Sequence, residues 1–195
     1  MHFPYQDLPP SLRLRYELVD GSNVQAYLPL FAGDPSPFVD QRFKHQARLA
    51  VYAEELLTDL RHSCKRGACD WLVRRRTDLQ PVGVVHLYNL SHEVIAGRIP
   101  YCAVGYALAA PFRRQGYGQE ALNQLLTQAA QLFGRTEVRA LSAVENLASQ
   151  ALLQRCGFTL LEERAAAYRR GAVRLWQRPL LSSDQEPSAL RGAGK

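Results

Sequence analysis

Residues 105–118 read GYALAAPFRRQGYG, and this stretch decides the fold of the 195-residue chain. An apolar run from Ile99 to Ala109 leads into it, which is typical of a central strand. Two glycines follow, and from Gly118 to Phe133 apolar residues recur at the spacing of an amphipathic helix. The stretch therefore predicts a strand, a glycine-rich turn and a helix that begins directly after the turn.

The start of this helix is a candidate site for phosphate. Its first amides have no acceptor within the helix, and the positive end of the helix dipole lies behind them. Gly116 and Gly118 would let a ligand approach the backbone closely, and Arg113 and Arg114 add positive charge. The alternative is a tight turn that binds nothing. Two nucleotide motifs are excluded: the phosphate loop needs a lysine that this turn lacks, and the dinucleotide fingerprint needs a third glycine where Ala121 stands.

Residues 113–118, RRQGYG, do match every fixed position of the R/Q-x-x-G-x-G/A element of the Gcn5-related N-acetyltransferases (GNAT). Residues 145–158, ENLASQALLQRCGF, resemble the later motif of that family, in which an asparagine opens a helix and Gly-Phe closes it. A predicted helix and a predicted strand separate the two segments, as in the family. The strong resemblance covers residues 99–160, and a weaker one covers residues 11–181.

Finer features resemble one branch of the family, the ribosomal-protein-alanine N-acetyltransferases of the RimJ/RimL type. They are Leu12 to Arg15, Gly105-Tyr106-x-Leu108 and Gly118-x-Glu120-Ala121. The resemblance implies acetyl-CoA as co-substrate and no metal. Its pyrophosphate would be held at the turn formed by Arg113, Arg114, Gln115, Gly116, Tyr117 and Gly118.

The rest of the chain supports one α/β (mixed α+β) domain. We expect a central mixed, mostly antiparallel and twisted sheet of about six to seven strands flanked by helices, the GNAT-like fold. The expected strands cover residues 12–16, 71–73, 82–88, 99–109, 138–144, 158–168 and 173–180. The expected helices cover residues 24–31, 38–61, 118–133 and 147–156. The domain would span residues 1–181, with a flexible tail over residues 182–195.

Composition narrows the function classes. The net charge is +6, and only three of the 24 basic residues are lysines, which favours an anionic ligand. The chain shows no apolar run long enough to span a membrane and no secretory signal, so we expect a cytoplasmic protein. The pair Cys64 and Cys69 lacks the second pair that a zinc site needs. A basic nucleic-acid-binding domain is a weaker alternative because no recognised binding motif is present.

The resemblance also implies roles in catalysis. Leu108 and Ala109 would pair with the pantetheine arm, and one of their amides would face the thioester carbonyl. Tyr168, about ten residues past Gly-Phe, would protonate the leaving thiolate, with Ser149 as the competing candidate. Asn146 would bind the pantetheine arm or a water. The structural alternatives are an ordinary strand tyrosine for Tyr168 and a helix cap for the pair Asn146 and Ser149.

The base that neutralises the amine is not identified by the sequence. The strands over residues 99–109 and 138–143 carry no carboxylate. Glu54, His86 and Glu93 remain as candidates, but their spacing in the sequence gives no reason to assign any of them as the base. This absence favours an amine of low pKa or a water relay, or else a non-catalytic acyl-CoA-binding sensor or partner-docking module of the same fold. Arg74 to Arg76 form either a solvated loop or a dock for an acidic partner.

The expected function is therefore an acetyl-CoA-dependent N-acetyltransferase that acts on a primary amine by direct attack in a ternary complex. The acceptor would be a peptide N-terminus or a small amine. The enzyme would be a monomer or a homodimer.

Overall fold

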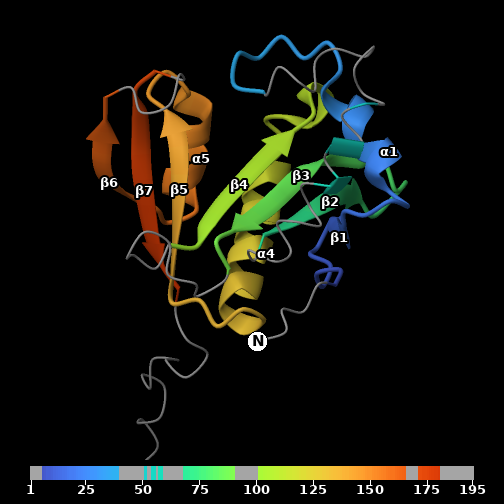
Figure 1. The fold of residues 1–195 in the computed structure, drawn as a ribbon, viewed down its shortest axis with the longest axis horizontal. Helices are drawn as coiled ribbons and strands as arrows, with labels where there is room; N and C mark the ends of the chain where they lie inside the picture. Colours follow the sequence, from blue (N-terminus) through green and yellow to red (C-terminus); the bar gives the residue numbers. More distant parts are fainter. Residues whose placement is uncertain are drawn as a thin grey trace, which may run out of the picture.

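The computed structural model describes residues 6–39, 51, 54, 55, 57, 58, 68–90, 101–165 and 171–180. The expected helix over residues 38–61 lies largely outside these residues, and Tyr168, Glu93 and the tail from 182 lie wholly outside them. The elements follow the expected order, and the predicted fold class is confirmed (Figure 1). The strands are β1 Leu14–Leu18, β2 Cys69–Arg75, β3 Pro81–Tyr88, β4 Ala103–Leu108, β5 Glu137–Ala143, β6 Thr159–Arg164 and β7 Val173–Pro179. The helices are α1 Val24–Tyr27, the 3-10 turns η1 Leu28–Phe31 and η3 Ala110–Phe112, α4 Tyr117–Gln131 and α5 Leu147–Arg155.

The seven strands form one sheet in the order β1-β2-β3-β4-β5-β7-β6. Every neighbouring pair is antiparallel except β4 and β5, which run in parallel. A parallel pair needs a crossover, and α4 supplies it between these two strands. The expected mixed, mostly antiparallel sheet is therefore observed, and its single parallel pair lies at the centre.

Helix α4 packs on one face of the sheet because one side of it is apolar. Ala121, Leu122, Leu125, Leu126 and Ala129 are almost completely buried there. They share a core with strand side chains on the face of the sheet that α4 covers, and Trp71 of β2 is fully buried in this core. The opposite face carries α1 and η1 over a smaller core. The two faces of β4 therefore meet different environments.

Helix α5 ends as its sequence predicts. Gly157 adopts a φ of +77°, a left-handed conformation that glycine reaches without a Cβ clash. The amide of Phe158 donates to the carbonyl of Leu153 at 3.0 Å, and the amide of Gly157 donates to Gln154 at 3.0 Å. These two bonds make the glycine-terminated cap that closes a helix sharply. The chain can then enter β6 at once.

Candidate active site

Strands β4 and β5 diverge at the centre of the sheet. Their described pairing joins Ala103 to Arg139 and Val104 to Ala140, and it goes no further along the two strands. On its other side β4 stays paired with β3 as far as Leu108. The edge of β4 that faces β5 is therefore open from Gly105 to Leu108, and Figure 1 shows the two strands parting. We call this opening the fork.

The direction of the β4 amides decides which of them the fork exposes. The amide of Ala109 donates to Val82 of β3 at 3.0 Å, and the carbonyl of Cys102 accepts from Arg139 of β5 at 2.9 Å. Because successive residues of a strand direct their N–H and C=O groups to opposite sides, Tyr106 and Leu108 face the fork. The structure thus directs the amide of Leu108 into the fork, whereas the amide of Ala109 is already bonded within the sheet, so of the two residues only Leu108 keeps the open amide that its expected role needs.

The start of α4 presents a second set of backbone donors. Gly116 caps the helix in the left-handed region, with φ at +82°, and no side chain caps the helix there. The first bond of the helix runs from the amide of Glu120 to the carbonyl of Gly116 at 3.1 Å. The amides of Tyr117, Gly118 and Gln119 therefore have no acceptor within the helix. Since β4 and β5 are parallel and each leads into a helix, α4 and α5 both begin at the open end of the fork (Figure 1).

Gly118 lets the helix start lie directly against the fork. A Cβ at this position would lie 3.1 Å from Leu152 of α5 and 3.2 Å from Leu108 of β4. These distances are tighter than ordinary van der Waals contact, so a side chain here would require the terminal methyl groups of Leu108 and Leu152 to shift by a few tenths of an ångström. The glycine therefore allows close packing of α4 against the strand that would hold the cofactor.

Arg113 and Arg114 differ in what their side chains do. The guanidinium of Arg113 donates to the carbonyl of Leu108 at 2.9 Å and forms an ion pair with Asp34, whose side chain is 2% exposed. It thus ties the turn after β4 to the segment that follows η1. Arg114 is exposed and has a left-handed φ of +63°. Of the two arginines, Arg114 is the one whose charge is directed to solvent beside the helix start.

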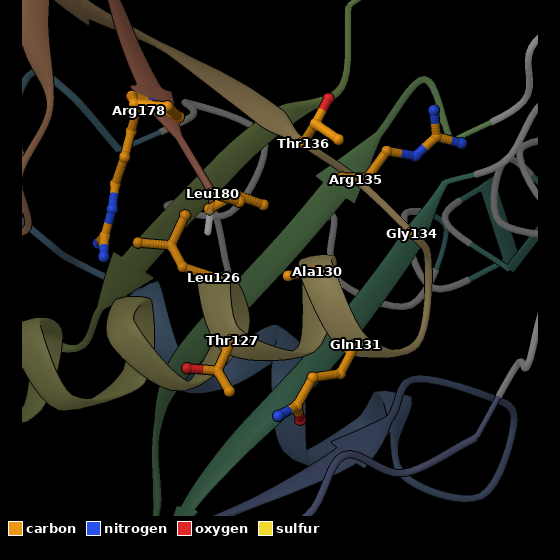
Figure 2. A pocket seen from close by; sticks show the side chains of 10 residues that line it. Leu126, Thr127, Ala130, Gln131, Gly134, Arg135, Thr136, Arg178 and Leu180 are labelled. Atoms are coloured by element: carbon orange, nitrogen blue, oxygen red, sulfur yellow. The ribbon is translucent and has the colours of Figure 1, made fainter. Parts of the chain in front are cut away.

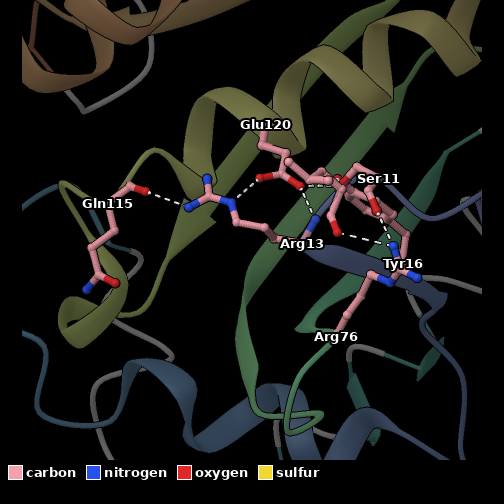
Figure 3. Close-up of polar contacts among 7 residues, drawn as sticks. Ser11, Arg13, Tyr16, Arg76, Gln115 and Glu120 are labelled. Carbon is pink, nitrogen blue, oxygen red and sulfur yellow. Dashed lines mark hydrogen bonds and ion pairs between the residues drawn. The ribbon is translucent and has the colours of Figure 1, made fainter.

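Arg13 and Glu120 anchor the cofactor turn, which is the segment of residues 113–118 (Figure 3). The side chain of Arg13 donates to Glu120 at 2.7 Å and to the carbonyl of Gln115 at 3.1 Å, and its guanidinium lies 4.5 Å from the centre of the Tyr117 ring. Glu120 also accepts from the backbone of Arg13 at 2.6 Å and from Ser11 at 2.7 Å. Burial raises the pKa of Glu120, but these hydrogen bonds and the charge of Arg13 outweigh it and hold the pKa below its usual value.

We expect Glu120→Gln to weaken acetyl-CoA binding about five-fold and to leave kcat nearly unchanged, because the variant loosens the turn without touching the reacting atoms. Because the pKa of Glu120 is lower in the folded state than in the unfolded chain, Glu120 stabilises the fold at pH values above its pKa in the unfolded chain. This stabilisation is lost as the pH falls through the pKa of Glu120 in the folded state. The stability gap between wild type and variant should therefore be present at pH 7 and close below about pH 4. Isothermal titration and urea unfolding measure the two effects. Glu162→Gln, which removes an exposed carboxylate on β6, is the control.

The start of α5 brings a partly buried pair of hydroxyl groups to the fork. The side chain of Asn146 accepts from the backbone amide of Ser149 at 3.1 Å and caps the helix. The hydroxyl of Ser149 lies 2.8 Å from that of Tyr106, which also donates to the Ser149 carbonyl at 3.2 Å. Burial raises the pKa of Tyr106 to about 12, although the bond with Ser149 opposes this. The sequence indicated Tyr106 only as part of the Gly105-Tyr106-x-Leu108 branch feature, and nothing in it pointed to the contact with Ser149.

The arginines of the β2–β3 hairpin are engaged within the fold. Arg74 pairs with Glu17 at 2.7 Å, and Arg75 pairs with Asp78. Arg76 donates to the carbonyls of Ser11 and Leu12 at 3.1 Å. Each of the three arginines therefore has a structural role within the fold. This does not favour the alternative that they bind an acidic partner.

A cavity of about 510 Å³ lies at the other end of α4 (Figure 2). Leu126, Ala130, Arg178 and Leu180 are among the residues that line it. It adjoins the last turns of α4, whereas the fork adjoins the first, so it forms no part of the candidate site. Within the described ranges, no three side chains come together that could hold a metal ion. No helix among them is long and apolar enough to cross a membrane.

Comparison with known families decides what this arrangement is. The family model described as an acetyltransferase (GNAT) domain matches residues 13–159. The chain belongs to the GNAT family. It is therefore an acetyl-CoA-dependent N-acetyltransferase, and the fold resemblance inferred from residues 105–118 and 145–158 is confirmed. No curated protein sequence matches the chain at a significant level.

Solved acetyltransferase structures share the fold, and they include both the expected branch and a polyamine acetyltransferase. RimJ of Mycobacterium smegmatis, in complex with CoA-disulfide, has a TM-score of 0.75 at 16% identity, over 92% of this chain and 90% of that one. The ribosomal-protein-S5-alanine acetyltransferase of Vibrio fischeri has a TM-score of 0.71 at 16% identity, over 92% and 99%. The spermidine/spermine N-acetyltransferase SpeG of Vibrio cholerae has a TM-score of 0.65 at 14% identity, over 86% and 93%.

The residues present fit acetyl-CoA. The open amides at the start of α4 suit its pyrophosphate, since backbone donors at a helix N-terminus favour phosphate. The open edge of β4 offers the N–H and C=O groups of Tyr106 and the N–H group of Leu108 to the amides of the pantetheine arm, whereas the Leu108 carbonyl already accepts from Arg113. When bound, the co-substrate supplies an activated acetyl group as a thioester.

Proposed function

We propose that this GNAT enzyme transfers the acetyl group of acetyl-CoA to a primary amine by direct attack in a ternary complex, with a protein N-terminal α-amino group as the acceptor. The observation that carries the proposal is the fork, whose open end meets the starts of both α4 and α5. A pantetheine arm that pairs with β4 from the cofactor turn inward would bring its thioester between Leu108 and Tyr106.

The reaction has four requirements: the cofactor must be held, the thioester carbonyl polarised, the leaving thiolate protonated and the amine deprotonated. The proposed site provides for the first three. The cofactor turn holds the pyrophosphate, and the amide of Leu108 or Tyr106 stabilises the oxyanion that develops on the thioester carbonyl. The Ser149 and Tyr106 hydroxyls lie beside the same strand and can return a proton to the thiolate. Tyr168, outside the described residues, stays the alternative donor. The fourth need is a proton acceptor for the amine.

The choice of an α-amino group follows from its acidity. An α-amino group has a pKa of about 7.7–8.0, whereas a lysine side chain has one of about 10.4. At pH 7 the neutral, nucleophilic fraction of the former is therefore several hundred times larger. Since β4, and β5 from Ala140 onward, contain no carboxylate, the site suits an amine that needs little help to lose its proton.

A screen of acceptors tests the proposal. Free N-terminal peptides, the same peptides blocked at the N-terminus with an internal lysine, and spermidine are each incubated with acetyl-CoA at pH 7, and the release of free thiol is measured. We expect the free N-terminal peptides to react at least tenfold faster than the blocked ones. A preference for spermidine or lysine would contradict the choice of acceptor. Thiol release from no amine, despite binding of acetyl-CoA, would contradict acetyl transfer and favour a sensor.

We also infer a cytoplasmic location, supported by the need for acetyl-CoA and by Cys102 and Cys156, which are buried thiols outside any disulfide. The proposed site is built from elements of one chain, so a monomer would suffice for it. A homodimer is equally compatible with this arrangement.

A further inference from the structure

A row of three residues crosses the sheet toward the fork on the face opposite α4. Asp70 of β2 is the register partner of His86 of β3, and His86 is the register partner of Gly105 of β4. Side chains of directly paired residues point to the same face, so the three residues share one side of the sheet. They share this side with the neighbouring Val84 and Ala107, which pack against the α1 and η1 core. The row ends at Gly105, the first residue of the open edge.

Gly105 leaves the space that the imidazole of His86 fills. A Cβ at Gly105 would lie 2.5 Å from Cδ2 of His86 and 3.3 Å from its Nε2. The Cδ2–Nε2 edge of the ring therefore lies directly over the strand at the fork. Tyr106, the next residue of β4, directs its amide into the fork, so Nε2 lies beside one of the two candidate oxyanion donors. Leu108, the other candidate, is three residues from Gly105, or about 10 Å along a strand.

The other edge of the ring faces a carboxylate. Nδ1 of His86 lies 3.3 Å from Oδ1 of Asp70, and both side chains are largely buried, at 15% and 11% exposed. Nδ1 has no well-aligned hydrogen bond in the described part of the chain, and the Asp70 carboxylate is the charged group that lies beside it. Tyr88 stacks on the ring at 5.4 Å. Asp70 of β2 and Tyr88 of β3 are therefore two titratable groups that lie against His86.

The proposed acid and this imidazole lie on opposite faces of β4. Tyr106 points to the α4 and α5 face, where it meets Ser149, and Gly105 points to the other face, under His86. A thioester held at the edge of β4 would therefore have a proton donor for its sulfur on one side and a proton acceptor on the other. This separation would let the acceptor for the amine proton and the donor to the thiolate act at the same thioester without neutralising each other.

We propose that His86 is the general base of this enzyme and that Asp70 positions it. The inference rests on the proposed amine acetylation. The amine nitrogen bonds to the thioester carbon and the C–S bond breaks. One proton passes from the nitrogen to Nε2 of His86, directly or through one water, and the thiolate takes a proton from the acid on the other face. Both groups then return to their starting states by exchange with solvent.

His86→Gln is the direct test, with the amine found in the acceptor screen. We expect kcat/KM for the amine to fall about 100-fold at pH 7, within the range for loss of a general base, and KM for acetyl-CoA to stay unchanged. The loss should shrink below about tenfold at pH 9.5, because solvent then supplies neutral amine and hydroxide. Asp70→Asn should reduce kcat about tenfold with the same dependence on pH. Asp20→Asn, the same change in the exposed turn after β1, is the control and should have no effect.

The outcomes separate the two proposals. If wild type acetylates the amine and His86→Gln is equally active, the assignment of His86 is overturned and the proposed function stands. The same conclusion holds if His86→Gln loses activity by a factor that does not vary with pH. A wild type that binds acetyl-CoA and acetylates no amine would overturn the proposed function and this inference with it. The thermal shift with acetyl-CoA shows whether each variant folds. If His86→Gln does not fold, Asp70→Asn decides, since unchanged kcat in that variant would overturn the assignment.

Discussion

Gly116→Glu should abolish acetyl-CoA binding, with an affinity at least 100-fold lower than that of wild type. Two effects add at this position. A residue other than glycine at a φ of +82° costs about 1–2 kcal/mol, which disturbs the turn. The new carboxylate would also stand at the helix start, where the open amides and the dipole attract the pyrophosphate, and would repel that anion.

The measurement is the shift in melting temperature with 1 mM acetyl-CoA. Wild type should be stabilised in proportion to the logarithm of the ligand concentration over Kd, and the variant should show no shift. Gly134→Glu is the matched control because Gly134 also has a left-handed φ, +58°, has nothing near its Cβ position, and follows the opposite end of the same helix. A retained shift in Gly116→Glu would show that the pyrophosphate binds elsewhere.

The structural features that the sequence predicted correctly depend on local patterns. The fold class, the helix after Gly116 and the cap at Gly157 follow from glycine positions and apolar spacing within about fifteen residues. Asn146 and Ser149 were placed together because a cap and its first turn are neighbours in sequence. Such features carry their own signal because the interactions that form them lie between nearby residues.

What the sequence could not show depends on contacts between distant segments. Arg113 was expected to serve phosphate, but its guanidinium meets Asp34, 79 positions earlier. Glu120 and Arg13 are 107 positions apart, and nothing in either segment indicates that they meet. The availability of the Ala109 amide likewise depends on its bond to Val82 in a neighbouring strand. The register of a sheet decides these contacts, and it is fixed by the whole core rather than by any one strand.

His86 illustrates the same limit on the catalytic side. In the sequence it is one of three remaining candidates for the base, and its spacing from the motifs gives no reason to prefer it. Only the pairing of β2 with β3 and of β3 with β4 brings Asp70, His86 and Gly105 into one row. A glycine in a central strand is a weak sequence signal for close approach of another group, and here that group is an imidazole ring.

Ser149→Ala is expected to lower kcat about 30-fold with little change in affinity for acetyl-CoA. The variant removes one hydroxyl of the pair with Tyr106 but keeps the helix cap, because Asn146 accepts from the backbone amide of Ser149 and not from its side chain. Loss of kcat without loss of stability would therefore separate a catalytic role from the structural alternative. Asn146→Ala should show the opposite pattern, with about 1 kcal/mol lost from the free energy of unfolding.

The companion variants identify the route of the proton to the thiolate. If Ser149 and Tyr106 act as one relay, then Tyr106→Phe should cost about as much as Ser149→Ala, and the double variant should cost little more than either, because groups that act as a unit are not additive. Tyr168→Phe should then be nearly neutral. The reverse result, with a large loss of kcat in Tyr168→Phe and a small one in Ser149→Ala, would assign the acid to Tyr168 and leave the Ser149–Tyr106 pair a packing role. Single-turnover release of free thiol at saturating acetyl-CoA measures all four variants on one scale, because it reports the step in which the C–S bond breaks.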